Sequence, residues 1–290
     1  MAKKFIIITT GRSGSQMLCE FLDNQVNIRC ELELLQAKKE EKHRQLLAKE
    51  RNYSSRLESD VKCREILGDD PSKFVGNRNR RFIEYLKIWE DMKPSEYFGF
   101  KVFFNDHIGS SILPEEDSIS YEDFTNYIKD NNIKIIHLTR DNLFLKYISA
   151  LTGRITGVYS SSSTSEINSI SVEVFYKKFI RFKNNLTKQK QDVFDFCSVN
   201  NIDVYHVTYE SLTGPDHTTY YKDILSFIGA DPNLFIDIRD TPMQKKTKTN
   251  VHSIRHKVSN LDELIEEATE ANDTELLDAI NVELIKMGEI

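Results

Sequence analysis

The chain has 290 residues, of which 39% are hydrophobic and 10% aromatic, enough for a substantial core in one α/β domain. Its net charge of −6 disfavours general binding to nucleic-acid phosphates. No apolar run approaches the roughly 18 residues of a membrane span, and the four cysteines form no CxxC pair, so we expect a cytoplasmic protein without a metal centre or a disulfide framework.

Four short runs rich in β-branched and aromatic residues predict buried strands, at residues 5–9, 98–104, 134–138 and 203–207. Helical patterns lie between these runs, which is typical of a parallel sheet flanked by helices. We therefore predict an α/β fold with a central parallel sheet, built as a single domain over residues 1–290.

The segments between these strands differ in character. Residues 36–95 are polar and predict a helical insertion, in which 73–89 carries an apolar face. Residues 157–171 are serine-rich and predict a surface loop, whereas 172–200 has the apolar stripe of one long helix. The acidic tail, about residues 261–288, predicts a C-terminal helix.

The first predicted strand runs into TTGRSGSQML (residues 9–18), a glycine turn followed by a helix. Such a turn directs backbone N–H groups and a helix dipole at one point, which favours an anion. Gly11 and Gly14 permit the tight backbone. Ser13 and Ser15 add hydroxyl donors. Arg12 adds a permanent cation whose forked donors suit phosphate or sulfate oxygens; an ordinary strand–helix turn is the simpler alternative.

The same residues resemble the 5′-phosphosulfate loop of sulfotransferases that use 3′-phosphoadenosine 5′-phosphosulfate (PAPS). Ser15-Gln16 replaces the GK[ST] ending of nucleotide triphosphatases, which disfavours a magnesium-dependent mechanism. Gln16 stands where the family usually has threonine, and its amide can still donate a hydrogen bond. The resemblance implies a P-loop nucleotide-kinase-like sheet, no metal, and a cofactor held by Gly11, Arg12, Ser13, Gly14, Ser15 and Gln16.

A second motif lies in IKIIHLTRDNLFLKYISALTGR (residues 133–154), where a buried strand gives way to a helix. Arg140 directly follows the strand, so it belongs to the crevice in which parallel sheets bind ligands. Ser149 lies more than two turns into the helix. The arrangement resembles the family's 3′-phosphate motif, which implies that Arg140 and Ser149 hold the 3′-phosphate. The alternatives are a salt bridge to Asp141 and a helix-packing hydroxyl.

Weaker matches follow along the chain. VYHVTYESLTGP (residues 204–215) resembles a family strand and turn, which implies that Tyr209 lies near the adenine. FGFKVFF (residues 98–104) resembles a strand of bacterial nodulation-factor and lipooligosaccharide sulfotransferases, which implies a hydroxyl acceptor on a glycan or glycolipid. A basic segment that starts at Gln244 resembles one that closes over the cofactor and implies a contact from Lys248, although a solvated basic loop is an equally simple interpretation.

An acceptor hydroxyl also needs a base, because its own pKa is far above 7. NIRCELELL (residues 27–35) resembles the family's Cys-His-Gly-Glu segment and implies that Glu33 is the general base. Glu31-Leu32 replaces His-Gly, so Glu31 is an alternative. His107, six residues beyond the strand residue Lys101, is the other candidate, because histidine ordinarily titrates near neutral pH. Of these we favour Glu33.

Taken together, the residues and the resemblance predict transfer of a sulfuryl group from PAPS to a hydroxyl, with adenosine 3′,5′-bisphosphate (PAP) as the leaving product. Arg12 and the loop amides would stabilise charge on the leaving phosphate. Two alternatives are open: a non-catalytic adenosine-bisphosphate-binding module, and a P-loop kinase with a degenerate loop. A kinase would need the GK[ST] lysine and an acidic residue at a strand end, where Thr139-Arg140 stands instead.

Overall fold

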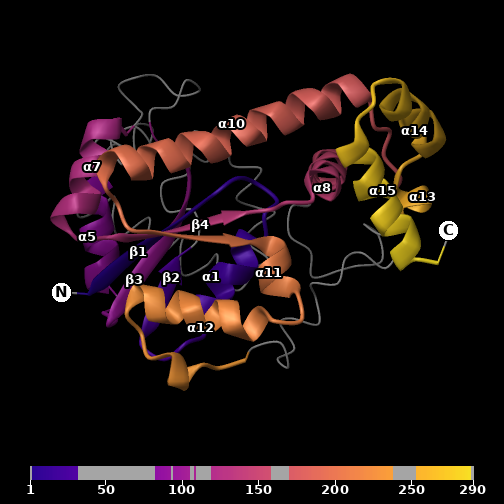
Figure 1. The fold of residues 1–290 in the computed structure, drawn as a ribbon. Helices are drawn as coiled ribbons and strands as arrows, with labels where there is room; N and C mark the ends of the chain where they lie inside the picture. Colours follow the sequence, from indigo (N-terminus) through magenta and orange to yellow (C-terminus); the bar gives the residue numbers. More distant parts are fainter. Residues whose placement is uncertain are drawn as a thin grey trace.

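The computed structural model describes residues 2–31, 82–92, 94–104, 108, 119–157, 170–237 and 253–288. These residues form an α/β protein around a five-stranded, all-parallel sheet with strand order β2-β3-β1-β4-β5 (Figure 1). The strands are β1 (Lys3–Thr9), β2 (Ile28–Glu31), β3 (Tyr97–Phe103), β4 (Lys134–Thr139) and β5 (Val204–Thr208).

All four predicted strands are confirmed to within two residues at each end, and the sheet is parallel as predicted. The edge strand β2 was not predicted. It has four residues, pairs only with β3 and carries Arg29 and Glu31, so its sequence has neither the length nor the apolar content of a buried strand. β2 is therefore a strand because its backbone pairs with β3, a contact that its own four residues do not reveal.

Helices cover both faces of the sheet (Figure 1). α1 (Ser15–Asp23) and α12 (His217–Ile228) pack on one face, and α5 (Phe82–Met92), α7 (Tyr121–Asp130) and α10 (Tyr176–Asn200) pack on the other. Because side chains alternate along a strand, Phe5 and Ile7 of β1 enter the first core, whereas Ile6 and Ile8 enter the second. A central strand buried on both faces explains the continuous apolar run from residue 5 to residue 8.

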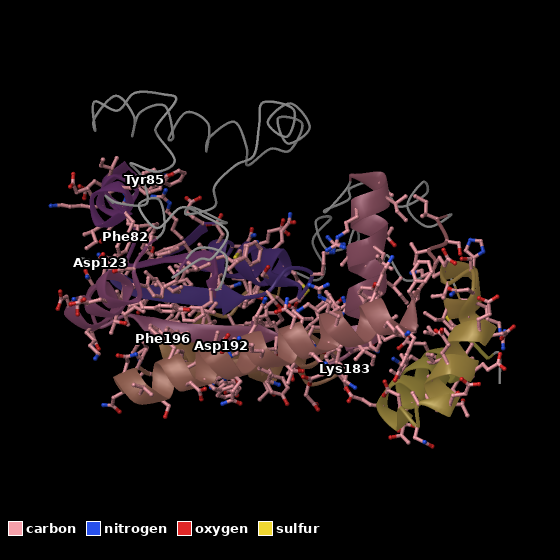
Figure 2. All side chains as sticks on the ribbon, turned by 90° about the horizontal axis from the view of Figure 1, so that it is seen from above. Phe82, Tyr85, Asp123, Lys183, Asp192 and Phe196 are labelled. Carbon is pink, nitrogen blue, oxygen red and sulfur yellow. The ribbon has the colours of Figure 1, made fainter. Side chains whose placement is uncertain are left out.

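The long helix predicted over residues 172–200 begins later, at Tyr176. Val172 instead forms a β-bridge with Val258, and the backbone N–H of Val174 donates to Asn260 Oδ1 at 2.9 Å. Pairing with a segment distant in sequence therefore holds this stretch extended. Figure 2 shows α10 reaching from the region of Lys183 to Phe196, near the end of the molecule that carries Phe82 and Tyr85 of α5.

The acidic tail contains more than the one helix predicted for about 261–288. α14 (Leu261–Glu270) and α15 (Thr274–Lys286) are separated by a turn, and Asp273 caps α15 by accepting from the N–H of Leu276 at 3.1 Å. With α13 (Ile254–Lys257) they pack against α8 (Leu143–Thr156) and the start of α10 in a third core cluster. Lys183 of α10 adds ion pairs to Asp273 at 3.7 Å and to Glu275 at 2.7 Å.

The strand order places a topological switch point between β1 and β4. After β1 the chain turns toward β2 at one edge, whereas after β4 it turns toward β5 at the other. Open α/β sheets bind ligands in the crevice at the carboxyl ends of such a strand pair. Among the helices that the structure describes, none is long and apolar enough to cross a bilayer. Most of the predicted insertion, nearly all of the serine-rich loop and the basic segment around Lys248 lie outside the described residues.

Candidate anion-binding site at the switch point

The backbone of the loop between β1 and α1 needs glycine at one of its two glycine positions. Gly14 adopts a left-handed φ of 78°, and a Cβ there would lie 2.4 Å from Cδ2 of Tyr209. Gly11 is not left-handed, and a Cβ there would meet no described atom within 4 Å. Gly11 therefore does not need glycine for a left-handed backbone, and no described residue occupies the space over it. Arg12 itself is left-handed, with φ 64°, which is rare for a side chain of this size.

The helix that follows the loop leaves its first N–H groups without a side-chain cap. Gly14 is the N-cap of α1 and, as glycine, has no side chain to cap it; no side-chain cap is present among the described residues, and the first turn holds no acidic residue. Since the first backbone donors of a helix have no partner within the helix, they favour an anion here. Ser13 and Ser15, predicted as donors to that anion, are 0% and 6% exposed, and the Ser13 hydroxyl turns inward to Thr10 at 3.2 Å.

The structure brings the loop against the β4–α8 junction. Arg12 Nε donates to Ser149 Oγ at 2.9 Å, and Arg140 Nη1 donates to the backbone oxygen of Arg12 at 3.4 Å. Ser149 faces the loop from α8, and Arg140 directly follows β4. The two motifs that the sequence marks separately therefore form one cationic site at the carboxyl ends of β1 and β4.

Arg140 has a buried guanidinium with an unpaired donor. Its side chain is 10% exposed, and its Nε lies 3.9 Å from Glu210 Oε1 but forms no hydrogen bond with any described residue. Burial lowers the pKa of Arg140, and the charge of Glu210 partly opposes this shift. The alternative of a salt bridge to Asp141 is not observed; Asp141 lies 3.9 Å from Lys190 instead. Because a buried, unpaired cationic donor is costly, the geometry of Arg140 suits an anionic ligand.

The short helix α11 (Tyr209–Thr213) completes the site from the end of β5. The Tyr209 ring lies against Gly14, and the Arg140 guanidinium carbon lies 4.7 Å from the centre of that ring, in a cation–π contact. Glu210 accepts hydrogen bonds from the backbone N–H groups of Asp141 and Asn142 at 3.0 and 3.1 Å. Tyr209 therefore lies beside the loop and Arg140, and its predicted place near the adenine stays a prediction. The role of Glu210 in closing the turn before α8 was not foreseen.

Lys146 is a site residue that the sequence reasoning missed. It is 2% exposed, and its Nζ donates to Ser13 Oγ at 2.7 Å and to Thr10 Oγ1. Burial and the charge of Arg140 lower the pKa of Lys146 to about 7. A signal was available, because Lys146 precedes Ser149 by three residues and such residues share one helix face.

A further lysine, on the C-terminal helix α13, interacts electrostatically with Arg140. Burial lowers the pKa of Lys257 in α13, the charge of Arg140 lowers it further, and Glu283 of α15 opposes this. Glu283 likewise acts on Arg140. Three basic residues in mutual contact through the loop and the β4–α8 junction therefore form the site in a chain whose net charge is −6: Arg12, Arg140 and Lys146.

The other predicted contacts are not assembled in the described part of the chain. Gln16 Nε2 donates to Glu20 Oε1 at 2.9 Å, one turn along α1. Glu33, His107 and Lys248 lie outside the described residues. Glu31, the alternative base, is paired with Arg29 Nε at 2.7 Å at the end of β2, two strands from β1 and so about 10 Å away by ordinary strand spacing.

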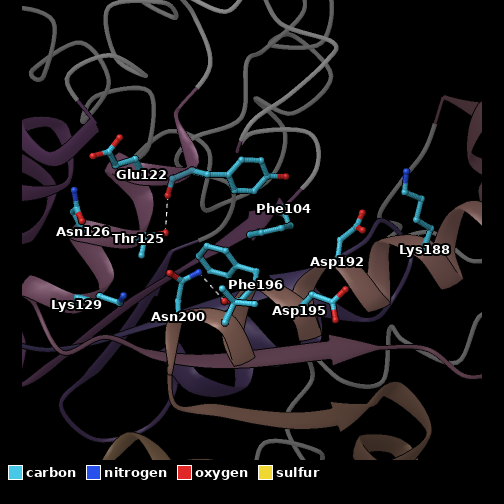
Figure 3. A pocket seen from close by; sticks show the side chains of 12 residues that line it. Phe104, Glu122, Thr125, Asn126, Lys129, Lys188, Asp192, Asp195, Phe196 and Asn200 are labelled. Atoms are coloured by element: carbon cyan, nitrogen blue, oxygen red, sulfur yellow. Dashed lines mark hydrogen bonds between the residues drawn. The ribbon is translucent and has the colours of Figure 1, made fainter.

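A cavity of about 720 Å³ lies elsewhere, between α7 and α10 (Figure 3). Phe104 and Phe196 pack together at it with ring centres 4.9 Å apart, and carboxylates, lysines and asparagines surround them. None of the residues of the loop, of the β4–α8 junction or of α11 lines this cavity. It is therefore separate from the anion site.

No family model matches the sequence, and a search of curated proteins found no match either.

Proposed function

We propose that the protein is a PAPS-dependent sulfotransferase that acts on a hydroxyl acceptor, with a glycan or glycolipid as the acceptor class favoured by the resemblance. The observation that carries the proposal is the contact between the two predicted half-sites, Arg12 to Ser149 at 2.9 Å, beside the unpaired Nε of buried Arg140. Both phosphates of an adenosine 3′,5′-bisphosphate are attached to one ribose, so such a nucleotide suits a site whose two cationic halves touch.

The residues fit this cofactor in two respects. Arg140 Nε forms no hydrogen bond with any described residue and would gain one from an anionic acceptor. No described atom occupies the space over Gly11, which would let a ligand approach the loop backbone closely. When bound, PAPS would supply the sulfuryl group and a phosphate leaving group. The uncapped amides of α1 and the Arg12 guanidinium would hold the 5′ end, and Arg140 with Ser149 would hold the 3′-phosphate. The Tyr209 ring, beside Arg140, would border the nucleoside.

In this proposal the chain contributes positioning and charge. Arg12 and the loop amides stabilise the negative charge that develops on the leaving phosphate. A base must take the proton of the acceptor hydroxyl, and Glu33 is our first assignment for it, with Glu31 and His107 as the alternatives. The pairing of Glu31 with Arg29 engages one of its carboxylate oxygens, which argues for Glu33 between the two acids.

The test has two parts. Calorimetry should show that PAP binds the chain much more tightly than AMP, which lacks the 3′-phosphate, and mass spectrometry should detect a sulfated product when PAPS is offered with a panel of glycans and glycolipids. Binding of PAP without sulfation of any acceptor would favour a non-catalytic bisphosphate-binding module. Failure to discriminate PAP from AMP would overturn the proposal.

The base is assigned by matched substitutions. Glu33→Gln should lower turnover by about 100-fold or more, from the lower end of the range for general base catalysis upward, and leave PAP affinity nearly unchanged. Glu31→Gln and His107→Asn serve as controls that should retain most of the turnover. Full turnover in Glu33→Gln, together with a loss in His107→Asn, would move the base to His107.

A further inference from the structure

The hydroxyl groups beneath the loop form a short chain that starts from a buried amine. Lys146 Nζ donates to Ser13 Oγ at 2.7 Å and also to Thr10 Oγ1, and the two hydroxyl oxygens lie 3.2 Å apart. Lys146 and Ser13 are 2% and 0% exposed, whereas Thr10 is partly exposed. The described residues thus connect the interior of the protein to the loop through three side chains.

The charge of Lys146 decides the direction of these hydrogen bonds. An ammonium group only donates, so both hydroxyl oxygens must accept from it and their own hydrogens stay available. Ser13 can then donate to Thr10, and Thr10 is left with a hydrogen that points away from Lys146. A neutral amine could instead accept from a hydroxyl, which would turn that hydrogen inward. The protonated state of Lys146 therefore leaves a hydroxyl donor for an anion at the loop.

We propose that Lys146 is the positioning residue of the anion site: it takes up a proton when a phosphate-bearing nucleotide binds and thereby turns the Thr10–Ser13 hydroxyl pair toward that nucleotide. The proposal rests on the proposed function only in taking PAP as the ligand. Lys146 does not contact the nucleotide itself but acts through the two hydroxyls and through its charge.

The surroundings of Lys146 explain why the ligand changes its protonation. Burial and the Arg140 charge disfavour the ammonium and lower its pKa to about 7, while Glu210 of α11 favours it. His137 of β4 also lies within its electrostatic reach but stays neutral, because burial lowers the pKa of His137 to about 3. Arg12, the cation of the loop, is bound to Ser149 on the same helix. A phosphate added to this cationic site favours the charged form of Lys146 and raises its pKa.

The sign of the pH dependence follows. The pKa of Lys146 is near 7 in the free protein and higher in the complex, so PAP affinity is complete below pH 7 and falls as pH rises toward the pKa of the complex. Phosphate monoesters have finished their second ionisation, with pKa about 6, by pH 7.5. Between pH 7.5 and 9 the affinity of the unaltered chain should fall by about tenfold.

Calorimetry of PAP binding over this pH range, in two buffers with different heats of ionisation, tests the proposal on the unaltered chain. The expected result is uptake approaching one proton per nucleotide near pH 8, with the affinity loss just given. Lys146→Met should bind PAP more weakly at pH 7.5 and show a flat pH profile. Lys146→Arg, charged at every pH, should also give a flat profile but keep more of the affinity.

One control addresses a second lysine whose pKa is also lowered by burial. Lys257 lies near Arg140, and burial lowers its pKa too, so Lys257→Gln should leave proton uptake and its pH dependence in place. PAP binding without proton uptake, or an unchanged slope in Lys146→Met, would overturn the inference and leave the proposed function intact. Proton uptake on PAP binding with no sulfated product would support the role of Lys146 and contradict the sulfotransferase function. Absence of PAP binding would overturn both proposals.

Discussion

Arg12 Nε and Ser149 Oγ, 137 positions apart in the chain, form a hydrogen bond of 2.9 Å that joins the loop after β1 to helix α8. The bond fixes a left-handed arginine at the ligand-binding end of the sheet, so the orientation of the cation depends on α8 as well as on the loop. Because of this bond, substitutions of Arg12 and Ser149 should have coupled effects on ligand binding, which a double-mutant cycle can measure.

We expect Ser149→Ala to weaken PAP binding by about tenfold and Arg12→Ala to weaken it more, because a hydrogen bond to a charged group contributes about 1.5 to 3 kcal/mol. Because Ser149 is also proposed to hold the 3′-phosphate, the double variant should bind worse than Arg12→Ala but lose less than the sum of the two single losses, giving a coupling energy of about 1 kcal/mol. Calorimetry on the four proteins measures this. Thr152→Ala, which removes a hydroxyl bonded to the α8 backbone, is the matched control. Strictly additive losses would mean that Ser149 does not orient Arg12.

Arg140→Ala should reduce affinity for PAP by about 100-fold, because it removes a buried cation that would face the 3′-phosphate. Affinity for AMP should change little, since AMP lacks that phosphate. Arg140→Lys should recover only part of the loss, because lysine keeps the charge but not the forked donors or the stacking on Tyr209. Arg154→Ala, an exposed arginine of α8, is the control. Equal losses for PAP and AMP would remove the 3′-phosphate assignment.

The two loop glycines should respond differently to alanine. Gly14→Ala should destabilise the protein by about 2 to 4 kcal/mol, because it combines a left-handed φ with a clash against the Tyr209 ring. Gly11→Ala should leave stability within about 0.5 kcal/mol, since its Cβ meets no described atom, but should weaken PAP binding if the ligand occupies that space. Urea unfolding and calorimetry separate the two effects. Unchanged PAP affinity in Gly11→Ala would show that the nucleotide stays clear of this backbone.

Stability should fall in mild acid because of a histidine pair in the sheet. His137 of β4 and His206 of β5 lie with their Nδ1 atoms 3.1 Å apart, and burial, followed by the charges of His206, Lys190 and Lys146, lowers the pKa of His137 to about 3. The folded state therefore binds fewer protons at His137 than the unfolded chain does. The contribution of His137 to the free energy of unfolding is complete above the unfolded pKa near 6.5 and is lost progressively as pH falls toward 3.

From pH 7.5 to pH 5 the loss due to His137 should be about 2 kcal/mol. The pKa of His206 is also lowered by burial, which acts in the same direction. His137→Gln should remove most of this loss, whereas substitution of the exposed His256 should not. Urea unfolding at the two pH values gives the comparison, and an equal loss in His137→Gln would show that other groups govern acid stability.

The sequence predicts the sheet and the two arginine-bearing turns well because each signal is local. The apolar run of β1 and the arginine that follows β4 can be recognised without knowing their neighbours. Lys146 and Glu210 are different, since each acts on a segment far away in the chain: Lys146 on Ser13, and Glu210 on the N–H groups before α8. The spacing of Lys146 and Ser149 can place the two on one helix face, but no short pattern identifies the distant partner of either Lys146 or Glu210.

Gly11 and β2 show the two ways in which local patterns mislead. Gly11 occupies a glycine-rich turn, yet its backbone is not left-handed and a Cβ there would meet no described atom, so neither φ nor crowding by the described residues requires glycine. β2 carries two charged residues in four and is a strand only because β3 provides its partner. The predicted acidic helix was interrupted by Asp273, whose capping carboxylate starts a new helix in the middle of the tail.

The contact between Gly14 and the Tyr209 ring has a consequence for how this protein can vary between species. A side chain gained at position 14 would collide with the ring, so it is tolerated only where position 209 has already lost an aromatic residue. The two positions should therefore change together in relatives. A substitution of Tyr209 by a smaller residue should come first in evolution, and a substitution of Gly14 should follow it. Arg140 stacks on the same ring, so lineages that abandon the tyrosine should also show relaxed selection on the arginine.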